Sequence, residues 1–351
     1  MSDRPHMTTQ ANLQDFITRS FLVCGVDAKG AALAADLMAR ADLMGQDGHG
    51  VFRLAQYIKR IQAGGINPAP VFRTVEDRAA TALVDGDNGL GHLVMHHATK
   101  LAMQKAETTG VAWVGVRNSN HAGPASLYAM MPLKKDMIGL YVAVASANHM
   151  PPWGGTTSLL GTNPIAVAIP SGVNPPIVLD MATTVAAYGK VKTAAQRGEP
   201  MPEGWMIDHF GKTITDPAKS KDGFLLPIGG AKGYGLALIF GILAGTLNGA
   251  AFGRNVVDFN ADATTQTNTG QFIIALDIKA FADPAVFRQG IDRVWADMKS
   301  SDRLPGVGEI RIPGERLHGI KQDRAAKGIP IAAALKAQLD VLAASLGVKP
   351  L

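Results

Sequence analysis

The sequence lacks several features that assign a chain to a particular class of protein, among them paired cysteines and a long uninterrupted apolar run. Its one cysteine, Cys24, excludes an internal disulfide and favours a reducing compartment. Its longest apolar run, Tyr234–Leu247, is interrupted by three glycines and is shorter than the roughly 20 residues that a membrane span needs. We therefore expect this run to form a buried helix, and the protein to have no membrane partner.

Basic blocks and export signals are also missing. The chain has 34 Lys and Arg residues against 29 Asp and Glu, and the two kinds are interspersed without neighbouring aromatic clusters, so we expect no nucleic-acid partner. The mild positive charge would instead attract anionic ligands. Because the first ten residues are polar, we expect no export signal and a cytoplasmic location.

The glycine fingerprint of the usual dinucleotide-binding fold, Gly-x-Gly-x-x-Gly, does not occur either. A nicotinamide enzyme built on a parallel, doubly wound sheet is therefore not supported. The composition is otherwise that of a globular protein. With 351 residues, 47% hydrophobic and 18% charged, the chain is long enough for two domains with separate cores.

Hydrophobic periodicity predicts an α/β protein. Apolar residues at helical spacing predict helices over residues 9–26, 31–43, 51–63, 91–108, 124–133, 181–196, 284–298 and 331–346. Short apolar runs predict strands over residues 81–85, 111–116, 138–145, 164–170, 177–180 and 271–277. In such proteins polar site groups often lie at loop-to-strand junctions, of which Leu160–Pro170 is one.

Two histidines stand in glycine-rich or polar stretches. His49 lies in Asp47–Arg53, four residues before Arg53 at the start of a predicted helix, so the two side chains can share one face. His121 ends the polar run Arg117–His121, just past a predicted strand. Either stretch alone is typical of an ordinary loop. Together, imidazoles that titrate near neutral pH and a guanidinium that pairs with carboxylate predict an enzyme for small carboxylated substrates.

A further histidine group, His92, His96 and His97, lies on one predicted helix and offers an i, i+4 pair for zinc. A zincin has glutamate after its first histidine, but this chain has Leu93. No cysteine or acidic cluster is available to complete a tetrahedral site. We therefore expect no metal.

The segment Pro227–Gly235 is rich in glycine around Lys232. It lacks the Gly-Lys-Ser/Thr ending of a nucleotide triphosphatase loop. Exposed backbone beside one lysine would suit a pyrophosphate, whereas close helix packing would explain the glycines equally well.

Short motifs follow one another in register along the chain. They are Ala41–Leu43 with Asp47–Gly50 and Arg53–Leu54, then Arg117–His121, Pro152–Gly155, Gly161–Pro164, Leu179–Thr184, Lys232–Gly235 and Ile312–Glu315. With these motifs, residues 8–345 resemble the malate/L-lactate dehydrogenase family of the second type. That family includes sulfolactate and ureidoglycolate dehydrogenases, 2,3-diketogulonate reductase and Δ1-piperideine-2-carboxylate reductase.

The resemblance implies an α/β fold of the sulfolactate dehydrogenase type, in which a mixed sheet flanked by helices binds NADH or NADPH without a Rossmann fold. It also implies a homodimer with the active site between two domains. We expect residues 1–75 and 300–351 to form a helical substrate and dimer domain. Residues 76–299 would form the dinucleotide-binding α/β domain, with a surface excursion at 198–224.

The resemblance also implies residue roles. His49 and His121 would handle the proton, and relatives differ in which histidine is assigned that task. Arg53 would bind the substrate carboxylate. Asp180 is expected among the catalytic residues, and Thr162 and Gly48 in the substrate pocket. The dinucleotide would lie along Asn120, His121, Ser146, Leu179, Asp180, Met181, Ala182, Thr183, Lys232, Gly233, Lys299 and Ser300.

The chain departs from the family pattern at Gly48, where most relatives have serine, and at Asn148–Met150, which relatives fill with Ser and Pro. Loss of the serine hydroxyl predicts a substrate that is bulkier than lactate or malate, or differently functionalised. The favoured activity is interconversion of a 2-oxo acid and its 2-hydroxy acid. Two alternatives stay open: reduction of a cyclic imine 2-carboxylate (Δ1-piperideine-2-carboxylate or Δ1-pyrroline-2-carboxylate), and noncatalytic dinucleotide binding.

Overall fold

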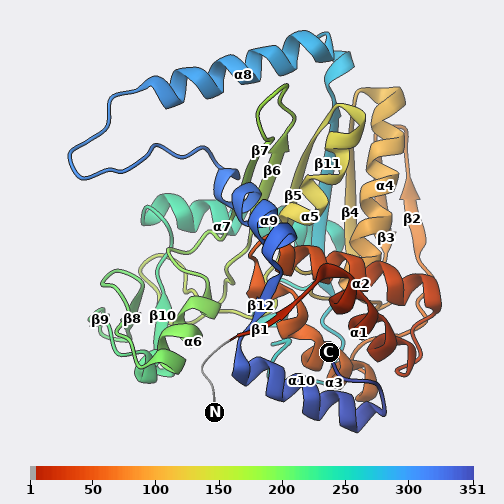
Figure 1. The fold of residues 1–351 in the computed structure, drawn as a ribbon, viewed down its shortest axis with the longest axis vertical. Helices are drawn as coiled ribbons and strands as arrows, with labels where there is room; N and C mark the ends of the chain where they lie inside the picture. The colour runs from red at the N-terminus through yellow and green to blue at the C-terminus, as the bar shows by residue number, and fades with distance from the viewer. Residues whose placement is uncertain (1–4) are drawn as a thin grey trace.

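A seven-stranded sheet forms the centre of the computed structural model, which describes residues 5–351 (Figure 1). Its strand order is β2-β3-β4-β11-β5-β6-β7. Only β3 and β4 run parallel in this sheet; its other neighbouring strands are antiparallel. The predicted mixed sheet is therefore confirmed. The strands are β2 (Arg73–Asp77), β3 (Thr81–Asp85), β4 (Val111–Ser119), β5 (Met137–Ala143), β6 (Ile165–Ile169), β7 (Ile177–Met181) and β11 (Thr269–Asp277).

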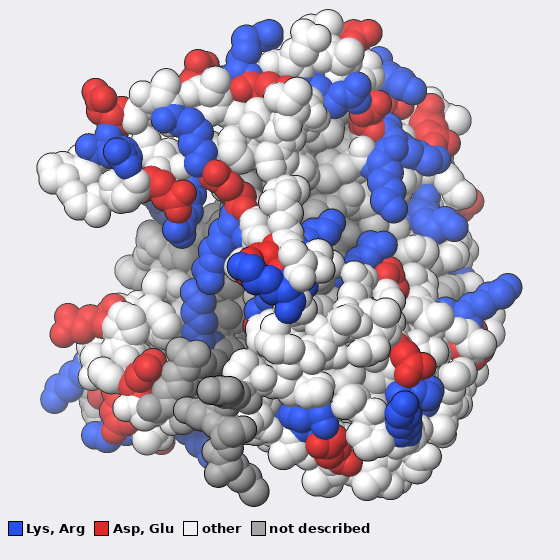
Figure 2. Space-filling view, viewed as in Figure 1, with Lys and Arg blue, Asp and Glu red and all other residues white. Residues whose placement is uncertain are grey.

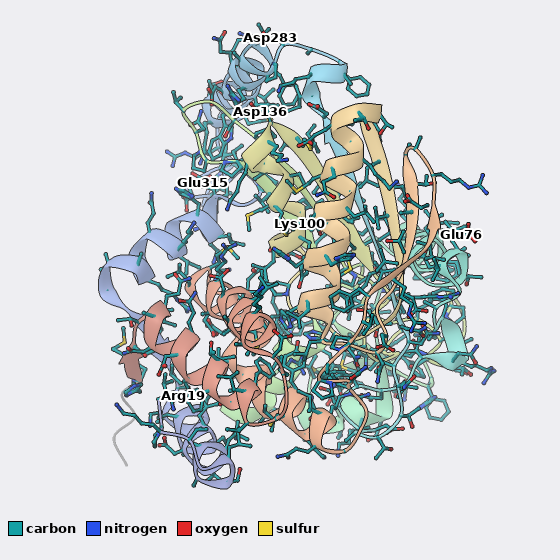
Figure 3. All side chains as sticks on the ribbon, turned by 90° about the vertical axis from the view of Figure 1, so that its right-hand side faces the viewer. Arg19, Glu76, Lys100, Asp136, Asp283 and Glu315 are labelled. Atoms are coloured by element: carbon teal, nitrogen blue, oxygen red, sulfur yellow. The ribbon has the colours of Figure 1, made fainter. Side chains whose placement is uncertain are left out.

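Helices flank this sheet on both faces and extend below it. Figure 3 shows α4, with Lys100, lying across one face, and the helices of the N-terminal segment stacked beneath. The helices are α1 (Gln10–Leu22), α2 (Ala28–Leu43), α3 (Leu54–Gln62), α4 (Gly91–Thr109), α5 (Ser126–Ala129), α6 (Tyr188–Arg197), α7 (Ala231–Ala244), α8 (Pro284–Ser300), α9 (Glu315–Lys327) and α10 (Ala333–Leu346).

Alternation along the central strands supplies a core on each face of the sheet. On β5, Tyr141 and Ala143 belong to the core that contains the buried residues of α4. Val142, between them, points to the opposite face and packs in a core with Ala244 of α7. Because successive side chains of a strand point to opposite faces, a strand covered on both sides is apolar throughout. This explains why 138–145 is a continuous apolar run.

A second core lies among α1, α2, α3 and α10, and so joins the two ends of the chain. Strand β1 (His6–Thr8) pairs antiparallel with β12 (Ile329–Ile331), which fixes the C-terminal segment against the N-terminal helices. Helix α2 begins where Asp27 accepts hydrogen bonds from the backbone N–H groups of Lys29 and Gly30, both at 2.9 Å. The predicted helix at 31–43 is confirmed and begins one turn earlier.

The expected surface excursion at 198–224 is a small lobe with its own core. It contains the three-stranded sheet of β8 (Met206–Asp208), β9 (Thr213–Ile214) and β10 (Gly223–Leu225), together with α6 (Figure 1). The lobe buries Val191, Met201, Met206, Ile214 and Leu225.

Three predicted helices differ from the structure. The helix expected at 124–133 is the short α5, followed by a 3-10 segment, Met131–Lys135. The helix expected from residue 181 begins only at Tyr188, because Thr183 and Thr184 make extended contacts with Thr162 and Pro227. The helix expected to be buried at 234–247 is α7, which packs one face on the sheet and exposes the other; Ile239 is 55% exposed. No helix within residues 5–351 is both long and apolar enough to cross a membrane.

Candidate active site

His49 and Arg53 lie on two short 3-10 turns, η1 (Asp47–His49) and η2 (Val51–Arg53), between α2 and α3. The buried Asp42 carboxylate accepts the Val51 N–H at 2.8 Å. A Cβ atom at Gly50 would lie 2.1 Å from Asp42 Oδ1, so only glycine fits there. Burial raises the pKa of Asp42 to about 8. This contact anchors the turn on the end of α2.

Helix α9 reaches the same turn from the far end of the sequence. The Arg324 guanidinium donates to the Asp42 carbonyl oxygen and forms an ion pair with the Asp47 carboxylate, with one hydrogen bond of 3.0 Å. The turn that carries His49 is thus held by α2 on one side and by α9 on the other.

His121 follows β4 in a loop that is tightly bound to its neighbours. The Asn120 amide donates to the carbonyl oxygens of Asn88 and Gly89 at 3.1 and 3.0 Å, and its oxygen accepts the Thr267 hydroxyl at 3.0 Å. A Cβ at Gly91 would lie 2.1 Å from the Asn120 carbonyl oxygen, which lets α4 start directly against this loop. The Asn120 side chain therefore orients the loop that carries His121.

The structure brings the predicted residues together. The rings of His49 and His121 are stacked, with centroids 5.4 Å apart and planes at 12°. Arg53 Nε donates to the Gly48 carbonyl oxygen at 3.0 Å, and its Nη1 donates to Asn260 Oδ1 at 2.7 Å. His49, His121 and Arg53 are each half-buried, so all three side chains have a part open to solvent. We call these three residues the acid–base cluster.

Two fully buried rings lie behind the acid–base cluster. Tyr57 on α3 places its hydroxyl oxygen 2.5 Å from His121 Nδ1. The ring of His92 on α4 meets the Tyr57 ring edge to face, with centroids 5.2 Å apart. Among the described residues neither ring nitrogen of His92, nor Nδ1 of His49, has a hydrogen-bond partner. Within residues 5–351 no set of three or more His, Cys, Asp or Glu side chains is arranged to hold a metal ion.

Burial and the nearby guanidinium keep these histidines neutral. Burial, and then Arg53, lower the pKa of His49 to about 4. Burial, and then His49, lower the pKa of His92 to about 3. The pKa of His121 is lowered well below its usual range by burial, Arg53 and the other two histidines. The cluster therefore carries one positive charge, on Arg53, at neutral pH.

Asp180 is connected to the cluster through a second layer of contacts. Its carboxylate accepts hydrogen bonds from Gln46 Nε2 at 2.8 Å and from the Ser126 backbone N–H at 3.0 Å. Gln46 lies just before the His49 turn, and Ser126 begins α5. Burial raises the pKa of Asp180. Among its recorded contacts Asp180 thus links β7, α5 and the His49 turn.

The predicted dinucleotide residues of β7 and α7 lie next to each other. The Thr162 carbonyl oxygen accepts both the N–H and the hydroxyl of Thr183, at 2.9 and 3.0 Å. The Thr183 carbonyl oxygen accepts the Ile228 N–H at 3.0 Å. Gly233 packs on Ile228, where a Cβ would lie 2.0 Å from its carbonyl oxygen. Lys232, in the first turn of α7, is exposed. Thus Thr162, the end of β7 and the start of α7 form one surface.

The remaining predicted cofactor-binding residues are Ser146, Lys299 and Ser300, and they do not all lie next to the acid–base cluster. The Ser146 carbonyl oxygen accepts the Phe259 N–H at 2.9 Å, and the Phe259 ring lies 5.6 Å from the His121 ring. Lys299 donates to the Ile310 carbonyl oxygen at 2.6 Å and forms an ion pair with Glu315 at 2.7 Å. Ser300 ends α8, which lies along the upper edge of Figure 1, away from α2 and α3.

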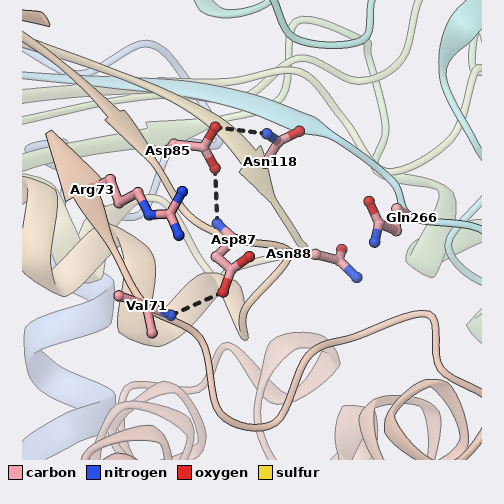
Figure 4. A pocket seen from close by; sticks show the side chains of 7 residues that line it. All are labelled: Val71, Arg73, Asp85, Asp87, Asn88, Asn118 and Gln266. Atoms are coloured by element: carbon pink, nitrogen blue, oxygen red, sulfur yellow. Dashed lines mark hydrogen bonds between the residues drawn. The ribbon is translucent and has the colours of Figure 1, made fainter. Parts of the chain in front are cut away.

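A separate polar pocket of about 220 Å³ opens at the end of β3 (Figure 4). None of the predicted site residues lines it. Asp87 and Asn88 there adopt left-handed backbone conformations, with φ of 48° and 54°. Asn88 accepts from the Asn120 amide, so this turn supports the His121 loop from behind. The pocket is lined by Val71, Arg73, Asp85, Asp87, Asn88, Asn118 and Gln266.

Sequence reasoning missed several residues of the site. Tyr57 follows Arg53 by four residues, so helical spacing alone could have identified it. Phe259 and Asn260 reach the cluster from a turn late in the chain, and no local pattern marks them. Gln46 directly precedes the Asp47–Arg53 motif and Ser126 lies in the predicted helix 124–133, but their bonds to Asp180 depend on tertiary packing.

The malate/L-lactate dehydrogenase family model matches residues 8–340. The chain belongs to this family. The malate dehydrogenase of Pyrococcus horikoshii is 37% identical over 350 residues, which cover 97% of this chain and 95% of that protein.

Solved structures agree with this assignment. The sulfolactate dehydrogenase of Methanocaldococcus jannaschii superposes with a TM-score of 0.91, at 37% identity over 98% of both chains. The Δ1-piperideine-2-carboxylate reductase of Pseudomonas syringae superposes with a TM-score of 0.83, at 29% identity, covering 96% of this chain and 99% of that one. The similarity thus extends over nearly the whole fold.

Proposed function

We propose that this family member is a nicotinamide-dependent dehydrogenase that interconverts a small 2-oxo acid and its 2-hydroxy acid. The observation that carries the proposal is the convergence of His49, Arg53 and His121, from two distant segments, into one half-buried cluster. The bound nicotinamide would supply or accept the hydride at its C4 carbon. The residues of the chain would bind the acid and move the proton.

Arg53 is suited to hold the substrate carboxylate. A guanidinium has five N–H donors, and Arg53 uses one at Gly48 and one at Asn260 among its recorded bonds. These two bonds fix the plane of the group, and a carboxylate can accept from the remaining edge in a bidentate pair. Such a pair would fix the orientation of the substrate beside the two imidazoles.

Substrate binding would also adjust the histidines. Arg53 contributes to the low pKa of both His49 and His121. A carboxylate bound to Arg53 offsets that positive charge, so the histidine pKa values would rise in the complex. A proton could then be held on an imidazole beside the substrate carbonyl, which general acid catalysis requires.

The surface formed by β7 and α7 is the proposed binding surface for the dinucleotide. Lys232 and the free backbone N–H groups at the start of α7 favour an anion such as a pyrophosphate. Leu179 is exposed, Asp180, Met181 and Ala182 are half-buried, and this strand end leads toward the cluster through Gln46. The largely antiparallel sheet supports binding by a fold other than the Rossmann type. We propose NADH or NADPH as the cofactor, without a preference.

We propose that the substrate lies beside His49 and next to Gly48. A Cβ at the exposed Gly48 would meet no atom within 4 Å, so the chain leaves open space at this position. This space supports a substrate with a larger group than lactate or malate. Reduction of a cyclic imine 2-carboxylate is the second candidate, supported by the likeness to the Pseudomonas syringae reductase. Noncatalytic dinucleotide binding is the third, and the intact acid–base cluster argues against it.

We infer a homodimer from the exposed face of α7. Leu236, Ile239 and Ile242 follow at intervals of three residues along that face, and Leu247 continues it. An apolar face of this kind on a soluble domain usually marks an interface. Figure 2 shows the molecule hollowed between the lobe of β8 to β10 and the arm of α8 with the loop after it, a shape that a second copy could enter.

Two further expectations remain proposals. We infer that residues 1–75 and 300–351 form the helical domain, because the second core draws on both; residues 1–4 lie outside the described part. Leu33 and Phe72 pack on both cores, so the two parts are in contact. We infer a cytoplasmic location from the single half-buried thiol of Cys24.

One assay separates the three activities. The protein would be incubated with NADH or NADPH and a panel of 2-oxo acids and cyclic imine 2-carboxylates, while the absorbance of the reduced nicotinamide is followed. We expect turnover of a 2-oxo acid bulkier than pyruvate. A higher kcat/KM for the imines would favour the second candidate. Cofactor binding without turnover of any compound would favour the third.

A further inference from the structure

The hydroxyl group of Tyr57 lies between two atoms of the same histidine. Its oxygen is 2.5 Å from His121 Nδ1 and 3.4 Å from the His121 carbonyl oxygen. The side chain is fully buried, so water does not compete for these contacts. The Gly123 backbone N–H also points at Nδ1, at 3.4 Å.

A hydroxyl can donate and accept, so Tyr57 can match either tautomer of His121. When Nδ1 is unprotonated, the Tyr57 O–H donates to it, as the Gly123 N–H also does. When Nδ1 carries a proton, that N–H donates to the Tyr57 oxygen, and the hydroxyl hydrogen can turn to the His121 carbonyl oxygen. Between the two arrangements the ring and hydroxyl hydrogens move, and the Gly123 N–H loses Nδ1 as its acceptor.

We propose that Tyr57 is the positioning residue that makes His121, rather than His49, the proton-transferring histidine. The proposal rests on the proposed dehydrogenase function. In the oxidation direction the substrate hydroxyl gives its proton to His121 Nε2, while the substrate carbon loses a hydride, with both electrons of its C–H bond, to the oxidised nicotinamide. During this transfer the Nδ1–H group of His121 donates a hydrogen bond to the Tyr57 oxygen. Reduction of the substrate follows the same steps in reverse.

His49 lacks a comparable partner. Its Nδ1 is buried and, among the described residues, has no hydrogen bond, so no neighbour selects its tautomer. Its ring instead stacks on His121 at 5.4 Å. His49 therefore shapes the position and the electrostatics of His121, whereas Tyr57 holds Nδ1 of His121 and so leaves Nε2 to face the substrate.

Besides burial, three neighbouring groups affect the pKa of His121. The titratable or charged groups that act on it are Arg53 on η2, His49 on η1 and His92 on α4. Tyr57 itself faces Arg53, and burial raises its pKa, so the hydroxyl stays protonated across the working range.

The test is the substitution Tyr57→Phe, which keeps the ring contacts with His92 and Phe259 and removes the hydroxyl. We expect kcat to fall roughly 10- to 100-fold, while KM for the acid changes little. An imidazolium without an acceptor for its Nδ1–H is less stable. The low-pH limb of kcat for oxidation should therefore move to lower pH by about one unit.

Tyr128→Phe is the matched control. It removes an equally buried hydroxyl whose hydrogen bond, at 2.5 Å, goes to the carbonyl oxygen of Ala122, the residue after His121, and not to the His121 ring. We expect its kcat and pH profile to stay close to those of the unmodified protein. An equal pH shift in both variants would assign the effect to general loosening of the loop and overturn the proposal.

A second measurement separates this proposal from the proposed function. With ¹⁵N-labelled histidine, NMR titration of the ligand-free protein should show a lower pKa of His121 in Tyr57→Phe and an unchanged pKa of His49. That result without any turnover of the substrate panel would leave the positioning role intact and refute the dehydrogenase. An unchanged His121 titration, or a pH shift that appears in His49→Ala and not in Tyr57→Phe, would refute the role of Tyr57.

Discussion

The acid–base cluster and the dinucleotide surface are built in different ways. In the cluster, hydrogen-bond partners within the chain hold the reactive groups before any ligand binds: the buried Tyr57 at His121, and the half-buried Asn260 with the exposed Gly48 at Arg53. On the dinucleotide surface, a strand end and the exposed Lys232 present groups to solvent. In the proposed enzyme, geometry would be demanding where the proton moves, whereas the cofactor would be held by several weaker contacts.

The largest expected effect is the loss of kcat when the imidazole that transfers the proton is removed from the cluster. We expect His121→Ala to lower kcat by roughly 10² to 10⁴, because no neighbouring group can replace its Nε2. His49→Ala should have a smaller effect if Tyr57 selects His121. Steady-state rates measure both, and His209→Ala, an exposed histidine on the lobe, is the control. Near-normal rates in both cluster variants would refute the proton roles.

Arg53→Lys tests the carboxylate contact with the charge retained. Lysine cannot form the planar pair, so we expect KM for the acid to rise roughly 10- to 100-fold, with a smaller change in kcat. The dissociation constant of the dinucleotide should stay nearly constant, because Arg53 belongs to the cluster. A change in cofactor binding as large as the change in KM would mean that the two regions are not separate.

Lys232→Ala tests the second region of the comparison, the proposed dinucleotide surface. We expect the dissociation constant of NADH or NADPH to rise about 3- to 10-fold, and the effect to shrink in high salt, because Lys232 acts as an exposed point charge. Lys299→Ala should have less effect, because Glu315 already pairs with that ammonium. Lys100→Ala, on α4, is the control. A larger loss in Lys299→Ala would restore that residue to the cofactor site.

The smallest expected effect concerns stability. The pKa of His92 is lowered to about 3, whereas in the unfolded chain it returns to about 6.5. Between these values the unfolded chain binds more protons, so the free energy of unfolding falls as the pH falls from 6.5 toward 4. In His92→Phe, Tm should decline less steeply over this range, as thermal scans at several pH values would show. An unchanged slope would mean that His92 is not the buried group responsible.

Local patterns in the sequence were enough for most elements. Period-two and period-3.6 spacing identified β3 and α4, because each buries a regular face. Motifs in register identified His49, Arg53 and His121. These predictions rely on short-range order, which a single sequence records well.

The order in which distant strands pair in the sheet could not be predicted from local patterns. Strand β11 lies between β4 and β5, although its residues come more than a hundred positions later, and nothing in its own sequence states that order. The exposed face of α7 was missed because a helix that is apolar all round has no pattern to separate a core from an interface. For the lobe the sequence predicts only a surface excursion, because its strands are two or three residues long.

The contact of Arg324 with Asp42 and Asp47 has a consequence for biosynthesis. A ribosome releases the His49 turn early, but the guanidinium that locks it emerges only after most of the chain has been made. The nascent protein thus has to wait for its last helices before its reactive histidines are set in place. A product that ends before Arg324 would retain both imidazoles and lack the contacts of Arg324 with the turn that carries His49.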